Sequence, residues 1–216
     1  IVSAKDYGLE KLYGDISATE MFSKFLKTPK NWFPEMKDFC RKLNIDCATT
    51  IHGKNGLEWS KKIGFDIIKV ASMDHDNIPF LESLVNVIES PILVSFGMAN
   101  LEDIHLAIET LSTHKYGLGM FHCVSIYPPQ TEEIRLSNIR FFRKHFKVPV
   151  GFSDHSNDTV TSLAAFTLGA GFFEKHITLD RNLPGPDHPF ALEPAQMKSY
   201  VKGIRSLSSE IISDMF

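Results

Sequence analysis

Two histidines stand at the ends of consecutive apolar segments in the C-terminal half of the chain. His155 follows Ser153 by two residues in GFSDHS, and His176 follows Glu174 by two residues in FEKHIT. Because side chains alternate along a strand, each histidine shares a face with the polar residue before it. Neutral imidazoles bind Mn²⁺, Fe²⁺, Co²⁺ or Zn²⁺ and leave positions open for a substrate. The pair is a candidate metal site, with two hydrogen-bonded core histidines as the alternative.

Lys69 interrupts the apolar sequence IIKVAS. Burying an ammonium is costly unless an anion accompanies it, so a lysine at this position predicts a phosphate or carboxylate ligand. Two alternatives are a lysine that reaches solvent at the strand end and a Schiff-base nucleophile. Short hydroxyl side chains stand at equivalent positions of this and neighbouring segments and predict a phosphate cradle: Thr50, Ser72, Ser95 and Ser153.

Two acidic residues are further candidates. Asp187 lies in PGPDH, after the last apolar segment, where prolines and a glycine predict a rigid loop suited to holding a polyol. An ordinary turn is the alternative. Asp74 follows Ser72 by two residues and is suited to exchanging protons or accepting a sugar hydroxyl. It equally fits a carboxylate near the start of the next helix.

Apolar segments rich in β-branched or aromatic residues alternate with helical patterns, which is typical of consecutive βα units. The predicted strands are 45–50, 67–72, 91–97, 119–125, 148–155 and 171–177. Ser17 and Glu20 form a capping box, and Asn100 and Asn157 each precede a helical pattern. A stripe from Trp32 to Leu43 predicts a helix before the first strand, and Met197 to Leu207 predicts a final one.

Two α/β architectures fit this pattern, an open doubly wound sheet and a closed (β/α)8 TIM barrel. The polar residues at the strand ends favour the barrel, because all its strand ends converge on one mouth. Neither a G-x-G-x-x-G nor a Walker sequence marks an open nucleotide-binding sheet. We therefore expect residues 1–216 to be a partial TIM barrel with about six of its eight units, two strands lying before residue 1.

Composition narrows the range of partners. The chain has 23 Lys+Arg and 26 Asp+Glu, a net charge of −3, which argues against nucleic acid or an anionic membrane as the main partner. No apolar run approaches the length of about 18 residues that a membrane span needs. Three scattered cysteines make no disulfide framework and indicate a reducing compartment, so we expect a cytoplasmic protein.

The order of six motifs resembles the sialic acid synthase family, whose members condense phosphoenolpyruvate with an N-acylated hexose. The motifs are IIKVAS, VSFGM, FHCVSIYP, GFSDHS, FEKHITLDR and PGPDH. The resemblance covers essentially the whole chain. It implies that an opening segment with a catalytic glutamate and a C-terminal antifreeze-like domain lie outside it. It also implies a homodimer in which one subunit's C-terminal domain caps the other's barrel.

The resemblance assigns roles to individual residues. It implies that His155 and His176 hold a divalent metal, for which Mn²⁺ is the first expectation and Mg²⁺ or Co²⁺ the alternatives. It places Asp74 near the reacting carbons and Asp187 against the acceptor sugar. The residues that it places around phosphoenolpyruvate are Thr50, Lys69, Ser72, Ser95, Ser125, Tyr127 and Ser153.

Three residues depart from the family pattern. Ser125 replaces a more usual asparagine, Phe96 replaces a threonine and His52 replaces a phenylalanine. A serine hydroxyl donates one hydrogen bond where an amide donates two, so we expect the Ser125 departure to affect phosphoenolpyruvate affinity most.

The expected activity is formation of a nonulosonic (sialic) acid and phosphate from phosphoenolpyruvate and an N-acyl amino sugar such as N-acetylmannosamine. A lysine-dependent aldolase that uses Lys69 and a non-catalytic sugar-phosphate binding remnant are the alternatives. Six units cannot close an eight-stranded barrel, so we also expect a polypeptide of residues 1–216 alone to aggregate through its bare edge strands and to be inactive.

Overall fold

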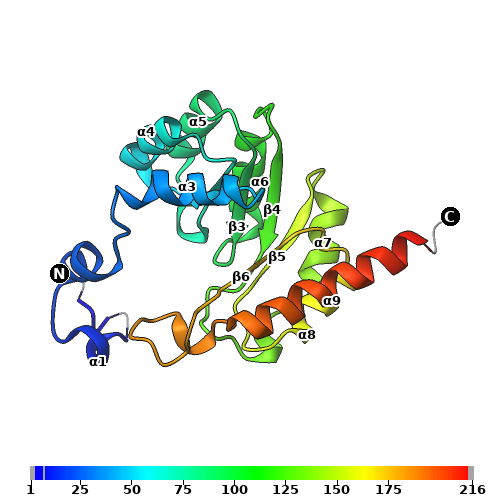
Figure 1. Ribbon diagram of the computed structural model, residues 1–216. Coiled ribbons are helices and arrows are strands. Elements are labelled where there is room, and N and C mark those ends of the chain that lie inside the picture. Colours follow the sequence, from blue (N-terminus) through cyan, green and yellow to red (C-terminus); the bar gives the residue numbers. More distant parts are fainter. Residues whose placement is uncertain (1–2, 7, 214–216) are drawn as a thin grey trace.

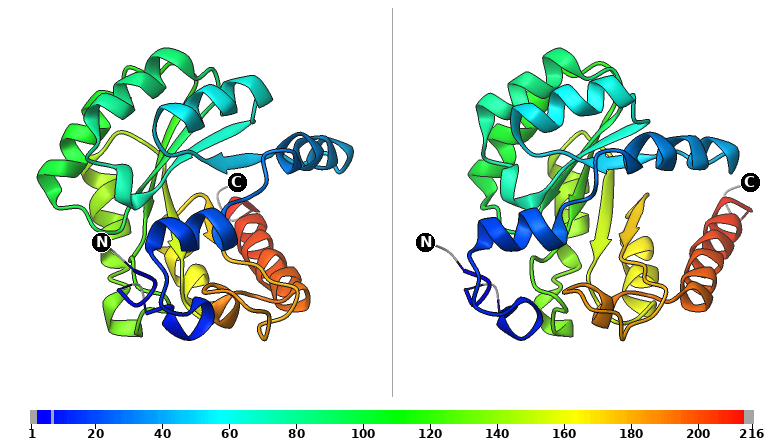
Figure 2. Two further views of the ribbon diagram at one scale, coloured as in Figure 1. Left: turned by 90° about the vertical axis from the view of Figure 1, so that its left-hand side faces the viewer. Right: turned by 60° about the vertical axis from the view of Figure 1, so that its left-hand side comes forward.

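Six parallel strands form one curved sheet in the computed structural model, which describes residues 3–6 and 8–213. The strands follow the chain order, and each pairs with the next: β1 (Ala48–Thr50), β2 (Ile67–Val70), β3 (Ile92–Phe96), β4 (Leu118–His122), β5 (Val150–Asp154) and β6 (Phe173–Lys175). Parallel neighbours need a crossover connection, and helices supply it here. The result is a half-barrel with β1 and β6 as its edges (Figures 1 and 2).

Helices cover the outer, convex side of the sheet (Figure 2). They are α3 (Trp32–Lys42), α4 (Gly53–Ile63), α5 (Ile78–Val87), α6 (Leu101–Leu111), α7 (Ser137–His145), α8 (Val160–Thr167) and α9 (Pro194–Ser213). The N-terminal segment adds α1 (Glu10–Tyr13), α2 (Ala18–Met21) and a short π-helix at Phe22–Leu26. Short 3₁₀ turns lie at Ser72–Asp74, Thr131–Glu133 and His188–Phe190. Within the described residues, none of these helices combines the length and apolar character of a membrane span.

The main core lies between the sheet and the helices. Alternate strand residues such as Ile68, Val94 and Phe152 point outward and are buried under helix residues such as Leu81 and Ile108. Burying each such side chain contributes about 1.5–3 kcal/mol to folding. The other residues of each strand face the concave side, so this packing fixes which side chains reach the barrel interior.

Phe172 fills the lower part of the concave side, and two glycines make room for it. A Cβ on Gly119 or on Gly151 would overlap the Phe172 ring, and a Cβ on Gly119 would also meet Leu93. Phe172 packs edge-on against Phe121 at a centroid distance of 4.7 Å. The polar residues of the interior therefore lie above an aromatic layer.

The structure confirms the alternating βα organisation and corrects several element boundaries. The first strand begins at Ala48 and not at residue 45, because residues 44–47 turn out of α3 before pairing starts. Asn157 does not cap α8; the Asp158 carboxylate accepts from the Val160 and Thr161 backbone N–H groups instead. Ser17 and Asn100 do cap their helices. In α3, one side packs on the core through Phe33 and Cys40, but most of the predicted apolar stripe is exposed: Trp32, Met36, Phe39 and Leu43.

Candidate active site

The candidate site lies at the C-terminal ends of the strands, on the concave side. Register places Lys69 beside Thr50 and Ser153 beside Glu174, so these side chains share one face of the sheet. The strand ends of a barrel are where its active sites form, because the loops that follow the strands surround the same opening.

Lys69, Glu174 and Ser153 form a hydrogen-bonded group that links β2, β5 and β6. Lys69 Nζ donates to Glu174 Oε1 at 2.7 Å, and the Ser153 hydroxyl donates to the same oxygen at 2.6 Å. Burial opposes ionisation of Glu174, but the Lys69 ammonium and these hydrogen bonds outweigh it and lower the pKa of the carboxyl. The side chains of Lys69 and Glu174 remain 19% and 33% exposed, so a ligand can reach them.

His155 stands next to this group with one nitrogen fixed and the other available. Its Nδ1 lies 2.7 Å from the Val124 carbonyl oxygen, which can only accept, so Nδ1–H is the donor. Its Nε2 lies 3.2 Å from Ser153 Oγ, whose single proton already goes to Glu174. Burial lowers the pKa of His155 to about 4, so the ring is neutral near pH 7. The Nε2 lone pair is therefore free to bind a cation.

His176 also has a polar partner at Nδ1. Its Nδ1 lies 3.4 Å from Asp187 Oδ2, and this hydrogen bond is the main reason that the pKa of Asp187 is lowered. The His155 and His176 ring centroids are 5.5 Å apart at an interplanar angle of 74°.

The two imidazoles fit a shared divalent cation. Outer partners that accept from Nδ1 are typical of metal-ligating histidines because they orient Nε2 toward the metal. In the part of the chain that the structure describes, no cluster of three or more His, Cys, Asp or Glu side chains is placed to hold a metal. The donor set is thus two histidines, which leaves the remaining positions to water or substrate.

Aromatic residues wall the site on the side of the last loop. The Tyr127 ring lies over His155 at a centroid distance of 4.2 Å, and Phe190 contacts both Tyr127 and His176. Burial raises the pKa of Tyr127 to about 12, so its phenol is neutral. Tyr13 approaches from the N-terminal segment; burial and the Asp187 charge raise its pKa.

The remaining predicted hydroxyl residues lie at the strand ends, where they contact neighbouring loops and side chains of the protein. Ser72 Oγ accepts from the backbone N–H groups of Gly97 and Met98, at 2.7 and 3.1 Å, and so joins two loops of the mouth. Ser95 is buried beside the Cys123 thiol. A Cβ on Gly97 would overlap Ser125 Oγ, which shows how closely these loops pack.

Asp74 has a partner that its predicted role did not include. Its Oδ2 lies 2.6 Å from His52 Nδ1, where the family pattern has a phenylalanine. The departure at His52 is therefore matched by an acidic residue across the rim. Thr50, also at this rim, is exposed at the edge strand.

Glu174 is the residue that sequence reasoning did not assign to the site. The sequence does contain a signal for Glu174, because a carboxylate two residues before His176 in an apolar strand must lie on the same face as the histidine. Lys69 was expected to meet a ligand anion, and the structure shows that Glu174 is its resident partner.

The comparison with protein families covers every residue that the structure describes. The model of the NeuB family matches residues 2–214. The chain belongs to the NeuB family. It is 32% identical to the N,N'-diacetyllegionaminic acid synthase of Campylobacter jejuni over 204 residues, which are 93% of this chain and 60% of that protein. It is also 32% identical to the Bacillus subtilis spore coat polysaccharide biosynthesis protein SpsE, over 96% of this chain and 56% of that one.

A solved structure agrees with this assignment to the NeuB family. The N-acetylneuraminic acid synthetase of Leptospira borgpetersenii, determined in complex with citrate, superposes with a TM-score of 0.84 at 29% identity, covering 94% of this chain and 70% of that one. The NeuB-family chain spans little more than half the length of the curated relatives that it matches.

Proposed function

We propose that this NeuB-family chain carries the catalytic residues of a synthase that joins C3 of phosphoenolpyruvate to the aldehyde carbon of an open-chain N-acyl amino sugar. A C–C bond forms, water adds at C2, and the C2–O bond to phosphate breaks, giving a nonulosonic acid and inorganic phosphate. The supporting observation is the junction of Lys69, Glu174, Ser153 and two histidines at one mouth.

Lys69 is suited to binding the phosphate or carboxylate of phosphoenolpyruvate. One of its three N–H donors goes to Glu174, which leaves two for an incoming anion. Glu174 holds the ammonium in place and Ser153 holds Glu174, so the cation is oriented before the substrate arrives. The mouth is partly desolvated, which strengthens the attraction for an anion.

His155 and His176 would hold the divalent cation, Mn²⁺ by preference. When bound, such a cation polarises a carbonyl oxygen and orients water. The protein's own contribution is to fix both rings through Val124 and Asp187. Tyr127 packs against His155 and Phe190 packs against His176, on one side of the pair. Asp187 is suited to accepting a hydrogen bond from a hydroxyl of the acceptor sugar, since its side chain is 59% exposed.

The Schiff-base aldolase is less well supported. A Schiff base requires an uncharged amine with a free lone pair, whereas Lys69 is paired with an ionised carboxylate that stabilises the ammonium. Borohydride reduction in the presence of pyruvate tests the point: a covalent adduct on Lys69 would favour the aldolase.

The direct test is to incubate the full-length protein with phosphoenolpyruvate, Mn²⁺ and a panel of acceptors. The panel holds N-acetylmannosamine, its 6-phosphate and diacetamido sugars. We expect phosphate release together with a nonulosonic acid product. Lys69→Met should lower the rate of both about 100-fold. Lys54→Met, which changes an exposed lysine of α4, should leave both rates unchanged. Binding of phosphoenolpyruvate without any turnover would point to a sugar-phosphate binding protein.

The metal site has its own test. His155→Ala and His176→Ala should each remove most of the bound Mn²⁺ and most of the activity, and the double variant should be little worse, because ligands that act as a unit are not additive. Full metal content in the double variant, measured by elemental analysis, would contradict the assignment.

A further inference from the structure

His52 and Asp74 meet at the rim of the mouth, where two adjacent strands end. His52 is the second residue after β1, and Asp74 closes the 3₁₀ turn that follows β2. His52 Nδ1 lies 2.6 Å from Asp74 Oδ2. The pairing of Thr50 with Lys69 brings the two segments together, so the contact lies beside the strand that carries Lys69.

The imidazole donates this hydrogen bond and the carboxylate accepts it. An ionised carboxylate can only accept, so the proton between the two atoms belongs to His52 Nδ1. Among the described residues, neither side chain makes another hydrogen bond or ion pair. Asp74 Oδ1 is not one of the enclosed polar atoms, and the side chain is 19% exposed. One oxygen of Asp74 is therefore held by the protein, and a ligand can reach the other.

The turn that carries Asp74 is fixed by hydrogen bonds of its own. The Asp74 carbonyl oxygen accepts from the Asn77 N–H at 3.2 Å. Ser72 Oγ accepts from the Gly97 N–H at 2.7 Å and joins the turn to the loop after β3. With the main chain held, the freedom that remains to the carboxylate is side-chain rotation, and His52 is the group that restrains it.

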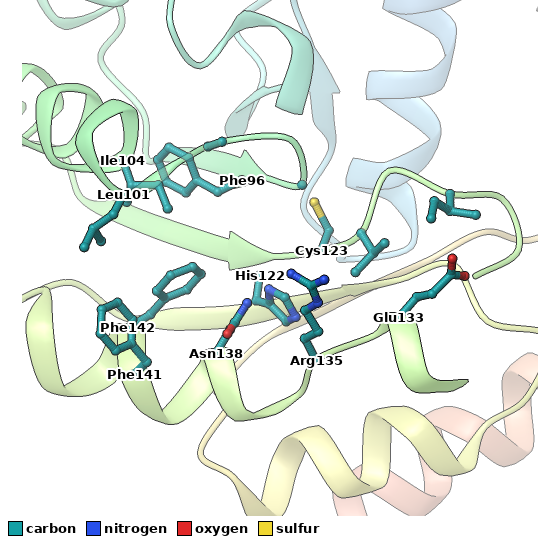
Figure 3. A pocket seen from close by; sticks show the side chains of 14 residues that line it. Phe96, Leu101, Ile104, His122, Cys123, Glu133, Arg135, Asn138, Phe141 and Phe142 are labelled. Atoms are coloured by element: carbon teal, nitrogen blue, oxygen red, sulfur yellow. The ribbon is translucent and has the colours of Figure 1, made fainter. Parts of the chain in front are cut away.

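A histidine with a structural role is placed differently in this fold. Figure 3 shows His122 at the end of β4, in the wall of a pocket between α6 and α7. Its side chain is 2% exposed, and its Nε2–H donates to the Ile134 carbonyl oxygen at 2.7 Å. The His52 side chain is 56% exposed. A contact this open to water adds little to stability, so its main effect is on the orientation of the Asp74 carboxylate.

We infer that His52 is a positioning residue of the proposed synthase: it holds one oxygen of Asp74 so that the other faces the substrates in the mouth. The inference rests on the proposed function and on the family resemblance, which assigns Asp74 to the reacting carbons. A carboxylate that accepts or exchanges a proton there needs a fixed geometry. The family pattern has a phenylalanine at position 52, which cannot donate a hydrogen bond, so relatives that follow the pattern lack this support.

The test compares His52→Phe with His52→Asn in the full-length protein, assayed with phosphoenolpyruvate, Mn²⁺ and the acceptor that the unchanged protein uses fastest. His52→Phe keeps an aromatic ring and removes the donor, so kcat should fall about tenfold while KM for phosphoenolpyruvate changes less than about twofold. The Asn carboxamide can place an N–H near the position of Nδ1, so His52→Asn should keep at least about half of kcat. His145→Phe changes an exposed histidine at the end of α7 and should leave both constants unchanged. The melting temperatures should stay within about 3 °C of each other.

A double-mutant cycle with Asp74→Asn tests whether His52 acts through the carboxylate. Asp74→Asn alone should lower kcat about 100-fold. Adding His52→Phe should lower it less than about twofold further, because the group that His52 positions is already altered. No turnover by the unchanged protein with any acceptor would overturn the proposed synthase and this role together. Turnover that His52→Phe leaves unchanged, an Asn variant as slow as the Phe variant, or a further tenfold loss in the double variant would overturn the role of His52 alone.

Discussion

Two lysine–carboxylate pairs lie on opposite sides of the sheet: Lys69 of β2 pairs with Glu174 of β6, and Lys175 of β6 pairs with Asp154 of β5. On the concave side, Lys69 and Glu174 are 19% and 33% exposed. On the outer side, Lys175 Nζ lies 3.0 Å from Asp154 Oδ2, and these two side chains are 2% and 0% exposed. The outer pair is enclosed by α8 and α9, through Ser162 and Tyr200.

The surroundings of the two pairs suggest different roles. Every polar atom of the outer pair meets protein: Lys175 also donates to the Ser156 carbonyl at 2.6 Å, and the Ser156 N–H donates to Asp154 Oδ1 at 2.9 Å. The inner pair keeps unused donors and faces the mouth. One pair can thus hold the strand ends together while the other stays available to a ligand, even though Glu174 and Lys175 are adjacent in the chain.

Breaking the outer pair should have the largest effect. Asp154→Asn leaves the Lys175 ammonium buried without a counter-charge, so we expect a loss of about 3–5 kcal/mol in the free energy of unfolding. Urea denaturation of the full-length protein measures it. The exposed Asp76→Asn serves as the control and should change stability by less than about 0.5 kcal/mol. Equal effects of the two variants would contradict the structural role of the outer pair.

Breaking the inner pair should affect function instead. Lys69→Met is expected to lower kcat/KM for phosphoenolpyruvate about 100-fold, or about 2.7 kcal/mol, because a preorganised cation is lost. Its effect on unfolding should stay within about 1 kcal/mol, since the pair is partly exposed. Unchanged kinetics would mean that Lys69 does not meet the substrate.

Removing the charge of Asp187, the carboxylate next to His176, should have a smaller effect than removing the histidine itself. Asp187→Asn keeps the shape of the side chain but weakens the hydrogen bond to His176 Nδ1. We expect Mn²⁺ affinity to fall about tenfold, the lower end of the usual range for such partners, because Asp187 is largely exposed. Titration followed by electron paramagnetic resonance measures the affinity. The exposed Asp46→Asn should leave it unchanged.

The smallest expected change in stability concerns Tyr200. This residue lies at the edge of the outer network, the hydrogen-bonded group around Lys175 and Asp154. Tyr200→Phe removes the hydroxyl that donates to Ser162 Oγ at 2.9 Å and keeps the buried ring. The expected cost is about 1 kcal/mol of unfolding free energy, the usual value of one hydrogen bond. Mn²⁺ affinity should not change; a parallel loss of Mn²⁺ would show that the outer network reaches the mouth.

The sequence was sufficient to predict the βα order and most of the inward-facing polar set. The period of two placed Ser153, His155 and His176 on one face, and the register confirms that placement for Ser153 and Glu174. The partner of Lys69 could not be read in the same way, because Glu174 is 105 residues away in the chain and only the curvature of the sheet brings the two together. The same limit hid the pairing of Asp74 with His52.

The sequence identified a helix N-cap reliably where only one candidate residue preceded the helix. Asn100 is the sole short polar residue directly before its helix, and it is the cap. Asn157 is followed by Asp158 and Thr159, and the ionised carboxylate of Asp158 accepts from two backbone N–H groups where an amide oxygen would bind them less strongly. The exposed stripe of α3 follows the helical period correctly, but a period does not show what lies opposite a helix.

The packing of Phe172 against two glycines restricts which residues relatives of this chain can carry at these three positions. Phe172 occupies space that exists only because Gly119 and Gly151 lack a Cβ. A single change at either glycine creates a clash, and a single change of Phe172 to a small residue leaves a void, so each step alone is unfavourable. The three positions should therefore be inherited as a set, and a side chain larger than hydrogen at 119 or 151 should accompany a smaller residue at 172.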